Sequence, residues 1–239
     1  MSARFRLSPG IDRAALRARF GRERRVRIAP FLVEEDAAAL AAHLADRDDW
    51  KQVLNSGDKV FEMDRVQLAA LDPAQAARLD AAVHASARDG FQFRFGSIRV
   101  PDDDAERTGD GRALAAFARF MSGPEVLALM VNVMGPSDIA FADAQATRYG
   151  PGDFLTAHDD EIAGKHRRAA YVFGLSRDWR AEWGGLLLFH EAGGEVAGFA
   201  PQFNALNLFA VPQPHSVSLV APFAPRERLS VTGWLRARS

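Results

Sequence analysis

Cysteine is absent from the 239-residue sequence. Its absence excludes disulfide bonds, thiolate metal sites and cysteine nucleophiles, and it is compatible with a reducing compartment. The sequence also lacks an apolar signal-peptide core near its start and any uninterrupted hydrophobic run of membrane-spanning length. We therefore expect a cytoplasmic protein that has no membrane partner.

A strong net charge is lacking too, since 30 Lys and Arg residues face 31 Asp and Glu residues. This balance gives no reason to expect direct binding of nucleic acid. The charge is uneven, however, because nine arginines fall between Arg4 and Arg27, opposed only by Asp12 and Glu23. They could meet an acidic partner such as a ribosome. A solvated amphipathic helix over residues 11–20 is the interpretation we favour.

The first 135 residues contain most of the helical patterns, in which apolar residues recur three and four positions apart. Predicted helices cover residues 34–45, 73–88, 112–121 and 124–134, and predicted short strands cover residues 25–28, 50–54 and 60–63. Ser122 is the expected N-cap of the last helix, with Pro124 at its first position. Residues 101–111 are expected to form a polar loop.

Aromatic and polar residues alternate in Phe91-Gln-Phe-Arg-Phe95, which is the pattern of a half-buried strand. These phenylalanines could line a substrate groove. Packing in the core is the interpretation we favour, because large apolar side chains are usually buried there.

The pattern changes after Gly135, where short apolar or alternating runs are separated by Gly, Pro, Asn and Asp. Predicted strands cover residues 139–149, 154–158, 169–175, 185–190, 205–211, 216–220 and 229–235. Such a series predicts a β-sandwich or barrel. We expect one domain over residues 1–239, mainly β, in which a helix-rich support (1–135) buttresses a β core (136–239).

His158 and Asp160 form a His-x-Asp pair, and His215 lies far downstream. On a strand, side chains two residues apart point to the same face, so His158 and Asp160 can share one metal while Asp159 points away. Two imidazoles and one carboxylate form the facial triad of non-haem Fe(II) oxygenases. By themselves these residues fit either a metal site or unrelated surface polar groups.

Arg228 and Ser230 share a face of the last predicted strand, shortly after His215. A guanidinium fork beside a hydroxyl suits a carboxylate that is bound through both oxygens at the bottom of a barrel. The alternative is a salt bridge on an edge strand, which would not require a serine at that spacing. Arg226 is a competing arginine nearby.

A longer pattern joins these residues. The segment 145–161, Gln-Ala-Thr-Arg-Tyr-Gly-Pro-Gly-Asp-Phe-Leu-Thr-Ala-His-Asp-Asp-Glu, resembles the 2-oxoglutarate/Fe(II) dioxygenases of the prolyl 4-hydroxylase superfamily. It is most similar to the ribosomal-protein prolyl hydroxylases and their bacterial relatives. The likeness spans residues 91–236 and continues through the segments 167–179, 184–189, 201–209, 214–217 and 228–234.

The resemblance implies a double-stranded β-helix, or jelly roll, with His158, Asp160 and His215 as iron ligands and catalytic centre. It also implies that Arg228, helped by Ser230, holds the distal carboxylate of 2-oxoglutarate, and that Tyr149 hydrogen-bonds this cosubstrate. The implied cofactors are Fe(II), 2-oxoglutarate and O2, with ascorbate as a further candidate. One departure is Gly174-Leu-Ser176, where the family often has Tyr-Leu-Asn, so a usual cosubstrate contact is replaced or lost.

The implied reaction is hydroxylation of a prolyl residue in a protein or peptide, with decarboxylation of 2-oxoglutarate to succinate. A ribosomal protein or translation factor is the first candidate substrate. Two alternatives stay open: the same chemistry on a free amino acid or small metabolite, and a jelly-roll binding module without catalysis.

Overall fold

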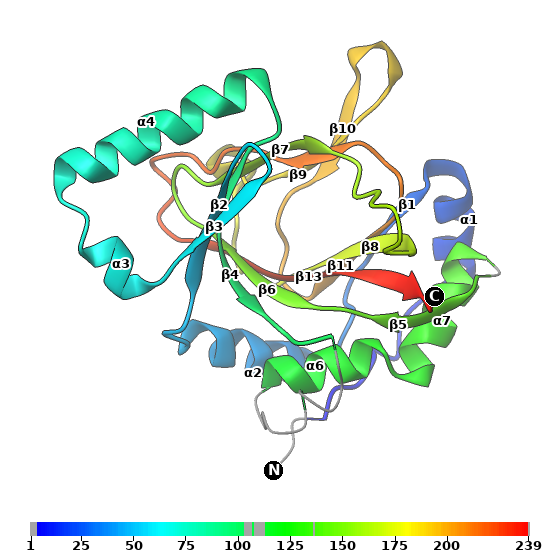
Figure 1. Ribbon diagram of the computed structural model, residues 1–239. Coiled ribbons are helices and arrows are strands. Elements are labelled where there is room, and N and C mark those ends of the chain that lie inside the picture. The colour runs from blue at the N-terminus through cyan, green and yellow to red at the C-terminus, as the bar shows by residue number, and fades with distance from the viewer. Residues whose placement is uncertain (1–3, 103–106, 108–112, 136, 239) are drawn as a thin grey trace.

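An antiparallel β-sheet that curls on itself dominates the computed structural model, which describes residues 4–102, 107, 113–135 and 137–238 (Figure 1). The predicted polar loop at residues 101–111 lies mostly outside these ranges. The first strands are β1 (Arg25–Ile28), β2 (Lys51–Ser56), β3 (Lys59–Met63), β4 (Phe93–Arg99), β5 (Ile139–Ala142), β6 (Gln145–Tyr149) and β7 (Phe154–His158). The later strands are β8 (Arg167–Gly174), β9 (Leu187–His190), β10 (Val196–Phe199), β11 (Ala205–Ala210), β12 (His215–Val217) and β13 (Arg228–Ala237).

The strand order explains the curl. Hydrogen-bonded neighbours follow the order β1-β11-β8-β13-β6-β4-β7-β12-β9-β10, while β2 pairs with β3 and β4, and β5 pairs with β13. Strand β4 joins the two halves, because residues 96–99 pair with β6 and residues 93–94 pair with β7. A central strand thus comes from the helix-rich part of the sequence, and the strands predicted there are confirmed.

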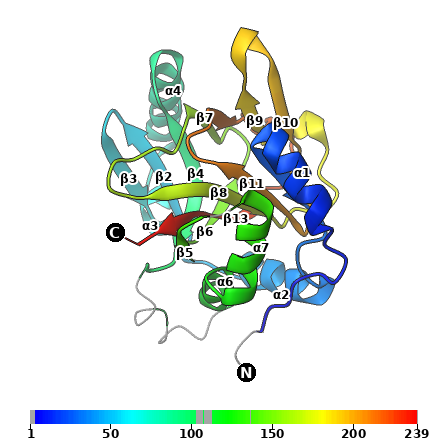
Figure 2. The same ribbon diagram turned by 90° about the vertical axis from the view of Figure 1, so that its right-hand side faces the viewer.

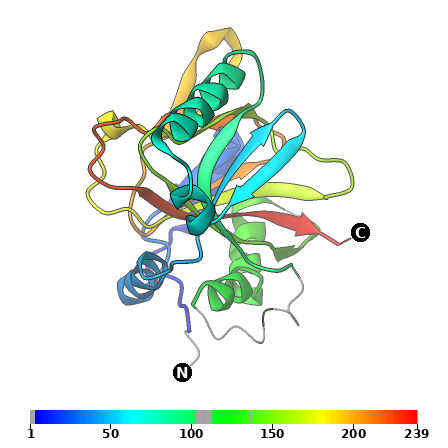
Figure 3. The same ribbon diagram turned by 60° about the vertical axis from the view of Figure 1, so that its left-hand side comes forward.

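Helices cover the outside of this sheet. They are α1 (Arg13–Glu23), α2 (Glu34–Ala45), α3 (Arg65–Ala69), α4 (Pro73–Asp89), α6 (Ala113–Met121) and α7 (Pro124–Met134), with two 3₁₀ turns at Ala181–Trp183 and Ala192–Gly194. Figure 2 shows α1, α2, α6 and α7 gathered against one side of the sheet. In Figure 3, α4 lies beside the β2–β3 hairpin, away from those helices. The mainly β architecture with supporting helices is therefore confirmed.

The main core lies between those helices and the outer face of β8, β11 and β13. Phe117 of α6 stacks on Phe173 of β8 with ring centroids 5.2 Å apart, and Phe31 meets Phe173 edge-on at 5.5 Å. The apolar positions predicted for α2 face the same core, where Ala37, Leu40 and Leu44 are completely buried. Burial of these side chains holds the helices to the sheet.

Helix α7 begins differently from the prediction. Gly123, not Ser122, is its N-cap, and no side chain caps its first turn. The Ser122 hydroxyl instead donates to the carbonyl oxygen of Ala142 and accepts from the Ala142 amide. The prediction was wrong because the end of β5, at Ala142, offers this serine a backbone partner that the sequence pattern does not show.

Among the described residues, no single helix is long and apolar enough to cross a membrane. Helices α6 and α7 meet that test only as a pair bent by 49°. Their apolar side chains, including Phe117, Leu129 and Met130, are buried in the main core.

Candidate active site

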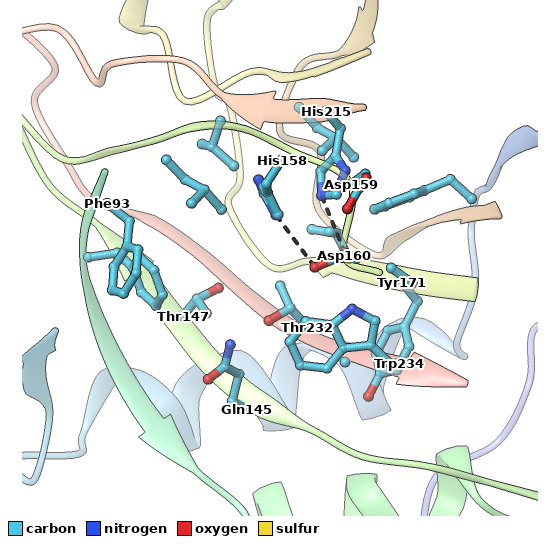
Figure 4. Close-up of a pocket in the computed structure, with 18 of the residues that line it drawn as sticks. Phe93, Gln145, Thr147, His158, Asp159, Asp160, Tyr171, His215, Thr232 and Trp234 are labelled. Atoms are coloured by element: carbon cyan, nitrogen blue, oxygen red, sulfur yellow. Dashed lines mark ion pairs between the residues drawn. The ribbon is translucent and has the colours of Figure 1, made fainter. Parts of the chain in front are cut away.

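The inner side of the curled sheet encloses a cavity of about 490 Å³. Figure 4 shows His158, His215 and Asp160 grouped at one side of it, with Phe93, Thr147 and Trp234 around them. The aromatic side chains of Phe91, Phe93 and Phe95 on and beside β4 form much of its wall. Residues far apart in sequence therefore meet in one enclosed space.

The three predicted metal ligands lie together. The ligand atoms of His158, Asp160 and His215 all lie within 4.8 Å of one another. His158 Nε2 is 3.5 Å from Asp160 Oδ1, and His215 Nε2 is 3.4 Å from Asp160 Oδ2. Two imidazole nitrogens and a carboxylate at this spacing suit one Fe(II) ion with positions open for other ligands.

Strand pairing brings the two histidines together. His158 is the last residue of β7 and is the register partner of His215, the first residue of β12. Each Nδ1 lies near a carbonyl oxygen, 3.0 Å for His158 with Thr156 and 2.9 Å for His215 with Gln213. A carbonyl can only accept, so each Nδ1 carries the proton and each Nε2 keeps its lone pair for a metal.

The backbone that positions Asp160 differs from the predicted strand. It lies beyond the end of β7 and has a left-handed backbone, with φ of 66°. The Asp159 carboxylate accepts the amide of Glu161 at 3.0 Å, which stabilises the turn. Asp160 rather than Asp159 does meet the histidines, but the turn, not the two-residue period of a strand, aims it there.

The charge states also suit a metal site. Burial and the adjacent His158 lower the pKa of His215 to about 4, so its ring is neutral near pH 7. Burial acts to raise the pKa of Asp160, but His158 and His215 outweigh this effect and hold that pKa below its ordinary value. The cluster thus offers two neutral nitrogens and one carboxylate, which is the donor set that Fe(II) requires.

Arg228 is the first residue of β13 and lines the cavity. It is only 4% exposed, and its guanidinium carbon lies 5.0 Å from the centre of the Tyr149 ring. Burial lowers the pKa of Arg228, and Tyr149 opposes this effect. No carboxylate is paired with Arg228 among the described residues, so it is suited to receive one from a ligand.

Tyr149 is the cross-strand partner of Arg228 and is 3% exposed. Its ring stacks on Phe95 with centroids 5.1 Å apart. Burial raises the pKa of Tyr149, so its hydroxyl keeps its proton and can donate a hydrogen bond. The structure brings both predicted cosubstrate contacts to one end of the cavity.

Ser230 takes a less direct position. It is completely buried, and its hydroxyl shares a hydrogen bond of 2.8 Å with the Thr147 hydroxyl. Thr147 lines the cavity and Ser230 does not. We therefore expect Ser230 to act by orienting Thr147, whereas the sequence pattern suggested a direct contact.

The competing residues lie elsewhere. Arg226 is exposed and stacks near Trp183, with its guanidinium carbon 5.7 Å from that ring. Ser176 accepts the amide of Leu229 at 2.8 Å, and it does not line the cavity. Only glycine fits at position 174, because a Cβ there would lie 2.3 Å from the carbonyl oxygen of Gln202. The segment Gly174-Leu-Ser176 therefore does not line the cavity.

The prediction that Phe91, Phe93 and Phe95 pack in the core was wrong. Phe91 is 50% exposed and lies 5.6 Å from the His158 ring, and Phe93 and Phe95 also line the cavity. Alternation identifies the strand correctly, but it does not reveal whether the aromatic face meets the core or a hollow. Here it meets the hollow, because β4 crosses the junction of the two halves of the sheet.

One cavity residue, Arg167, was not among the predicted site residues. Arg167, at the start of β8, donates to the Asp160 carbonyl oxygen at 2.9 Å, and its guanidinium carbon lies 3.5 Å from the Trp234 ring centre. It also lies 3.7 Å from Asp160 Oδ1. The signal in the sequence was a conspicuous pair, Arg167-Arg168, entering a predicted strand. Arg168 instead faces out and pairs with Asp138 at 2.7 Å.

Comparison with known sequences identifies this arrangement. Residues 144–236 match the sequence profile of the 2OG-Fe(II) oxygenase superfamily. This segment holds β6, the metal-ligand cluster and Arg228. Over this segment the chain resembles the 2OG-Fe(II) oxygenases. The superfamily uses Fe(II), 2-oxoglutarate and O2, and the His158, Asp160 and His215 cluster supplies a donor set that fits the iron.

The chain also resembles a curated protein. It is 34% identical over 105 residues to the Prolyl 3-hydroxylase OGFOD1 of Xenopus laevis. The match covers 41% of this chain and 20% of that protein, so the chain spans about a fifth of its relative's length.

Solved structures confirm the jelly-roll fold. The chain superposes on a prolyl hydroxylase from Trichoplax adhaerens, in complex with a hypoxia inducible factor peptide, with a TM-score of 0.61 and 16% identity. That match covers 94% of this chain and 88% of the other. A Pseudomonas putida prolyl-4-hydroxylase matches with a TM-score of 0.50 and 20% identity, covering 85% of this chain and 100% of the other.

Proposed function

We propose that this protein hydroxylates a prolyl residue in a protein or peptide, coupled to decarboxylation of 2-oxoglutarate to succinate. The observation that carries the proposal is the placement of the His158, Asp160 and His215 cluster beside a phenylalanine wall, above buried Arg228. The fold, the family profile and the prolyl hydroxylases among its relatives support it.

His158, Asp160 and His215 would hold Fe(II), and Arg228 would bind the distal carboxylate of 2-oxoglutarate through its guanidinium fork. When bound, iron and cosubstrate supply the oxidising chemistry with O2. Tyr149 donates its hydroxyl proton to a hydrogen bond with the cosubstrate. Burial of this end of the cavity excludes water and strengthens each of these contacts.

The other end of the cavity suits a prolyl ring. Phe91, Phe93, Phe95 and Leu155 provide an apolar wall beside the metal ligands. A prolyl residue within a chain presents an apolar ring and no amide N–H, so it needs no acceptor in such a wall. Phe91 and Ile162 are 50% and 51% exposed at this cavity, which leaves apolar surface for the rest of a polypeptide.

A free amino acid or small metabolite is the second candidate substrate. Arg167 favours it to some extent, because this cationic side chain in the cavity could bind an α-carboxylate. The exposed apolar surface of Phe91 and Ile162 favours a polypeptide. A ribosomal protein or translation factor is the first polypeptide to try; ascorbate dependence and the cytoplasmic location stay predictions.

Mass spectrometry tests the proposal. Proline-containing peptides, candidate ribosomal proteins and free amino acids are incubated with the protein, Fe(II), 2-oxoglutarate and O2. We expect one polypeptide to gain one oxygen atom, with one succinate formed per oxygen gained. Oxygen transfer to a free amino acid alone would overturn the choice of substrate class. A binding module would form no succinate with any of them.

A further inference from the structure

A second hollow, of about 290 Å³, opens beside the active-site cavity. The two share lining side chains, which are Phe93, Phe95, Arg99, Gln145, Arg167 and Trp234. The two spaces are therefore adjacent, with these side chains on the boundary between them. A polypeptide bound at the metal ligands that extends past these side chains would reach the second hollow.

The second hollow is basic. Among the residues that the structure describes, its charged lining consists of four cations, Arg99, Lys165, Arg167 and Arg236, and two carboxylates, Asp102 and Asp143. Burial raises the pKa of Asp143, and its carboxylate lies 3.4 Å from the guanidinium of Arg236. We call this space the basic hollow. Near the metal ligands, the active-site cavity is also lined by the exposed carboxylates of Asp159 and Glu161.

The four cations of the basic hollow differ in their hydrogen-bond and ion-pair partners. Arg236 donates to Asp102 at 3.1 Å and to the Lys165 carbonyl oxygen at 2.9 Å, and Arg167 is held by Asp160. The side chain of Arg99 is 66% exposed, and its closest carboxylate, Glu62, is 3.6 Å away. Lys165 is exposed, and its ammonium group has no ion pair with any residue that the structure describes. Lys165 is thus free to meet a ligand, and Arg99 is held only by the longer contact with Glu62.

We propose that the basic hollow binds an acidic side chain of the substrate polypeptide, close in sequence to the hydroxylated proline. This specificity rests on the proposed prolyl hydroxylation. A carboxylate placed between Lys165 and Arg99 gains two attractive charges, while a lysine at the same position is repelled. Since an extended residue spans at most about 3.6 Å, the acidic residue lies within a few positions of the proline.

Labelled synthetic peptides test this inference by binding, without turnover. Each has one proline in an Ala and Gly background, with Glu, Gln or Lys placed one to four residues to either side. Fluorescence anisotropy is measured with the metal-loaded enzyme, using Co(II) or Mn(II). We expect one Glu position to bind about fivefold more tightly than its Gln counterpart, and less so at high salt, as for a partly exposed ion pair.

Charge reversal then locates the contact. Lys165→Glu should remove the preference for Glu and favour the Lys peptide, with a change of about five- to tenfold in each direction. Lys59→Glu is the matched control, because this exposed lysine at the start of β3 lines neither space. An unchanged preference in Lys165→Glu, or equal binding of all peptides, would overturn the inference.

Hydroxylation of the same peptides separates the two proposals. If the Glu peptide binds selectively but gains no oxygen, the acidic recognition holds and prolyl hydroxylation fails. If peptides are hydroxylated with no charge preference, the proposed function holds and the basic hollow has no such role. Failure of every peptide to bind would also contradict the inference.

Discussion

Strands β8, β11 and β13 present two faces with different chemistry. The outer face buries Phe173, Leu208 and Val231 completely against the helices. The inner face carries Arg228 and Thr232 of β13 toward the cavity. An apolar face is stabilised by burial alone, but each buried polar group needs a partner to offset its lost hydration. Changes on the two faces should therefore separate stability from activity.

The largest expected effect is on stability, from the outer face. Phe173→Ala removes a ring that is stacked between Phe117 and Phe31, and large-to-small changes at such sites cost about 3–5 kcal/mol. Urea unfolding followed by circular dichroism measures this loss. The folded fraction should keep the KM for 2-oxoglutarate. A loss below about 1 kcal/mol, as is usual for surface substitutions, would show that this face does not form the main core.

Arg228→Met, on the inner face, should impair cosubstrate binding and leave stability nearly unchanged. It removes the buried guanidinium expected to bind a carboxylate, and losing one partner of such a pair costs about 2–5 kcal/mol of binding. We expect the KM for 2-oxoglutarate to rise about 100-fold or more, with the unfolding midpoint nearly unchanged. Arg226→Met is the control and should leave the KM unaltered, because Arg226 lies outside the cavity. Equal effects of the two variants would contradict the assignment.

Arg167→Ala tests whether Asp160 is held in place by its surroundings. Without the contact to the Asp160 carbonyl oxygen, the left-handed turn loses a support, and changes behind a metal ligand weaken affinity about 10- to 100-fold. Anaerobic titration with Co(II) gives this affinity without turnover. Arg168→Ala provides a neighbouring control that should bind Co(II) normally. Normal affinity in Arg167→Ala would show that Asp160 needs no such support.

The smallest effect is expected for Ser230→Ala. The change leaves the buried Thr147 hydroxyl without its 2.8 Å partner, which costs about 1 kcal/mol of stability. Since Thr147, not Ser230, lines the cavity, the KM for 2-oxoglutarate should change only a few-fold. Thermal unfolding and steady-state kinetics measure both quantities. A rise in KM as large as that of Arg228→Met would restore a direct role for Ser230.

The sequence predicts this fold well where one periodic pattern determines the outcome. The alternation along 229–235 locates β13, and its register with β6 then brings Arg228 opposite Tyr149. The short β10 and α3 escaped prediction, because four- and five-residue elements carry little periodic signal.

The site shows where such patterns stop being informative. Asp160 was selected by a strand rule, yet a left-handed turn positions it. The phenylalanines of β4 were assigned to the core, because alternation does not distinguish a core from a cavity. Arg167 was missed, since its contact with Asp160 depends on how a loop folds back between β7 and β8. Each of these is a tertiary relation that a local pattern does not encode.

The central claim is that His158, Asp160 and His215 hold Fe(II) beside a 2-oxoglutarate bound by Arg228. Anaerobic absorption spectroscopy tests it most directly, because Fe(II) chelated by a 2-oxo acid has a visible charge-transfer band. We expect the band when Fe(II) and 2-oxoglutarate are both added to the wild-type protein, and its loss in a folded His158→Ala variant. Absence of the band in folded wild-type protein, or an undiminished band in His158→Ala, would contradict the account.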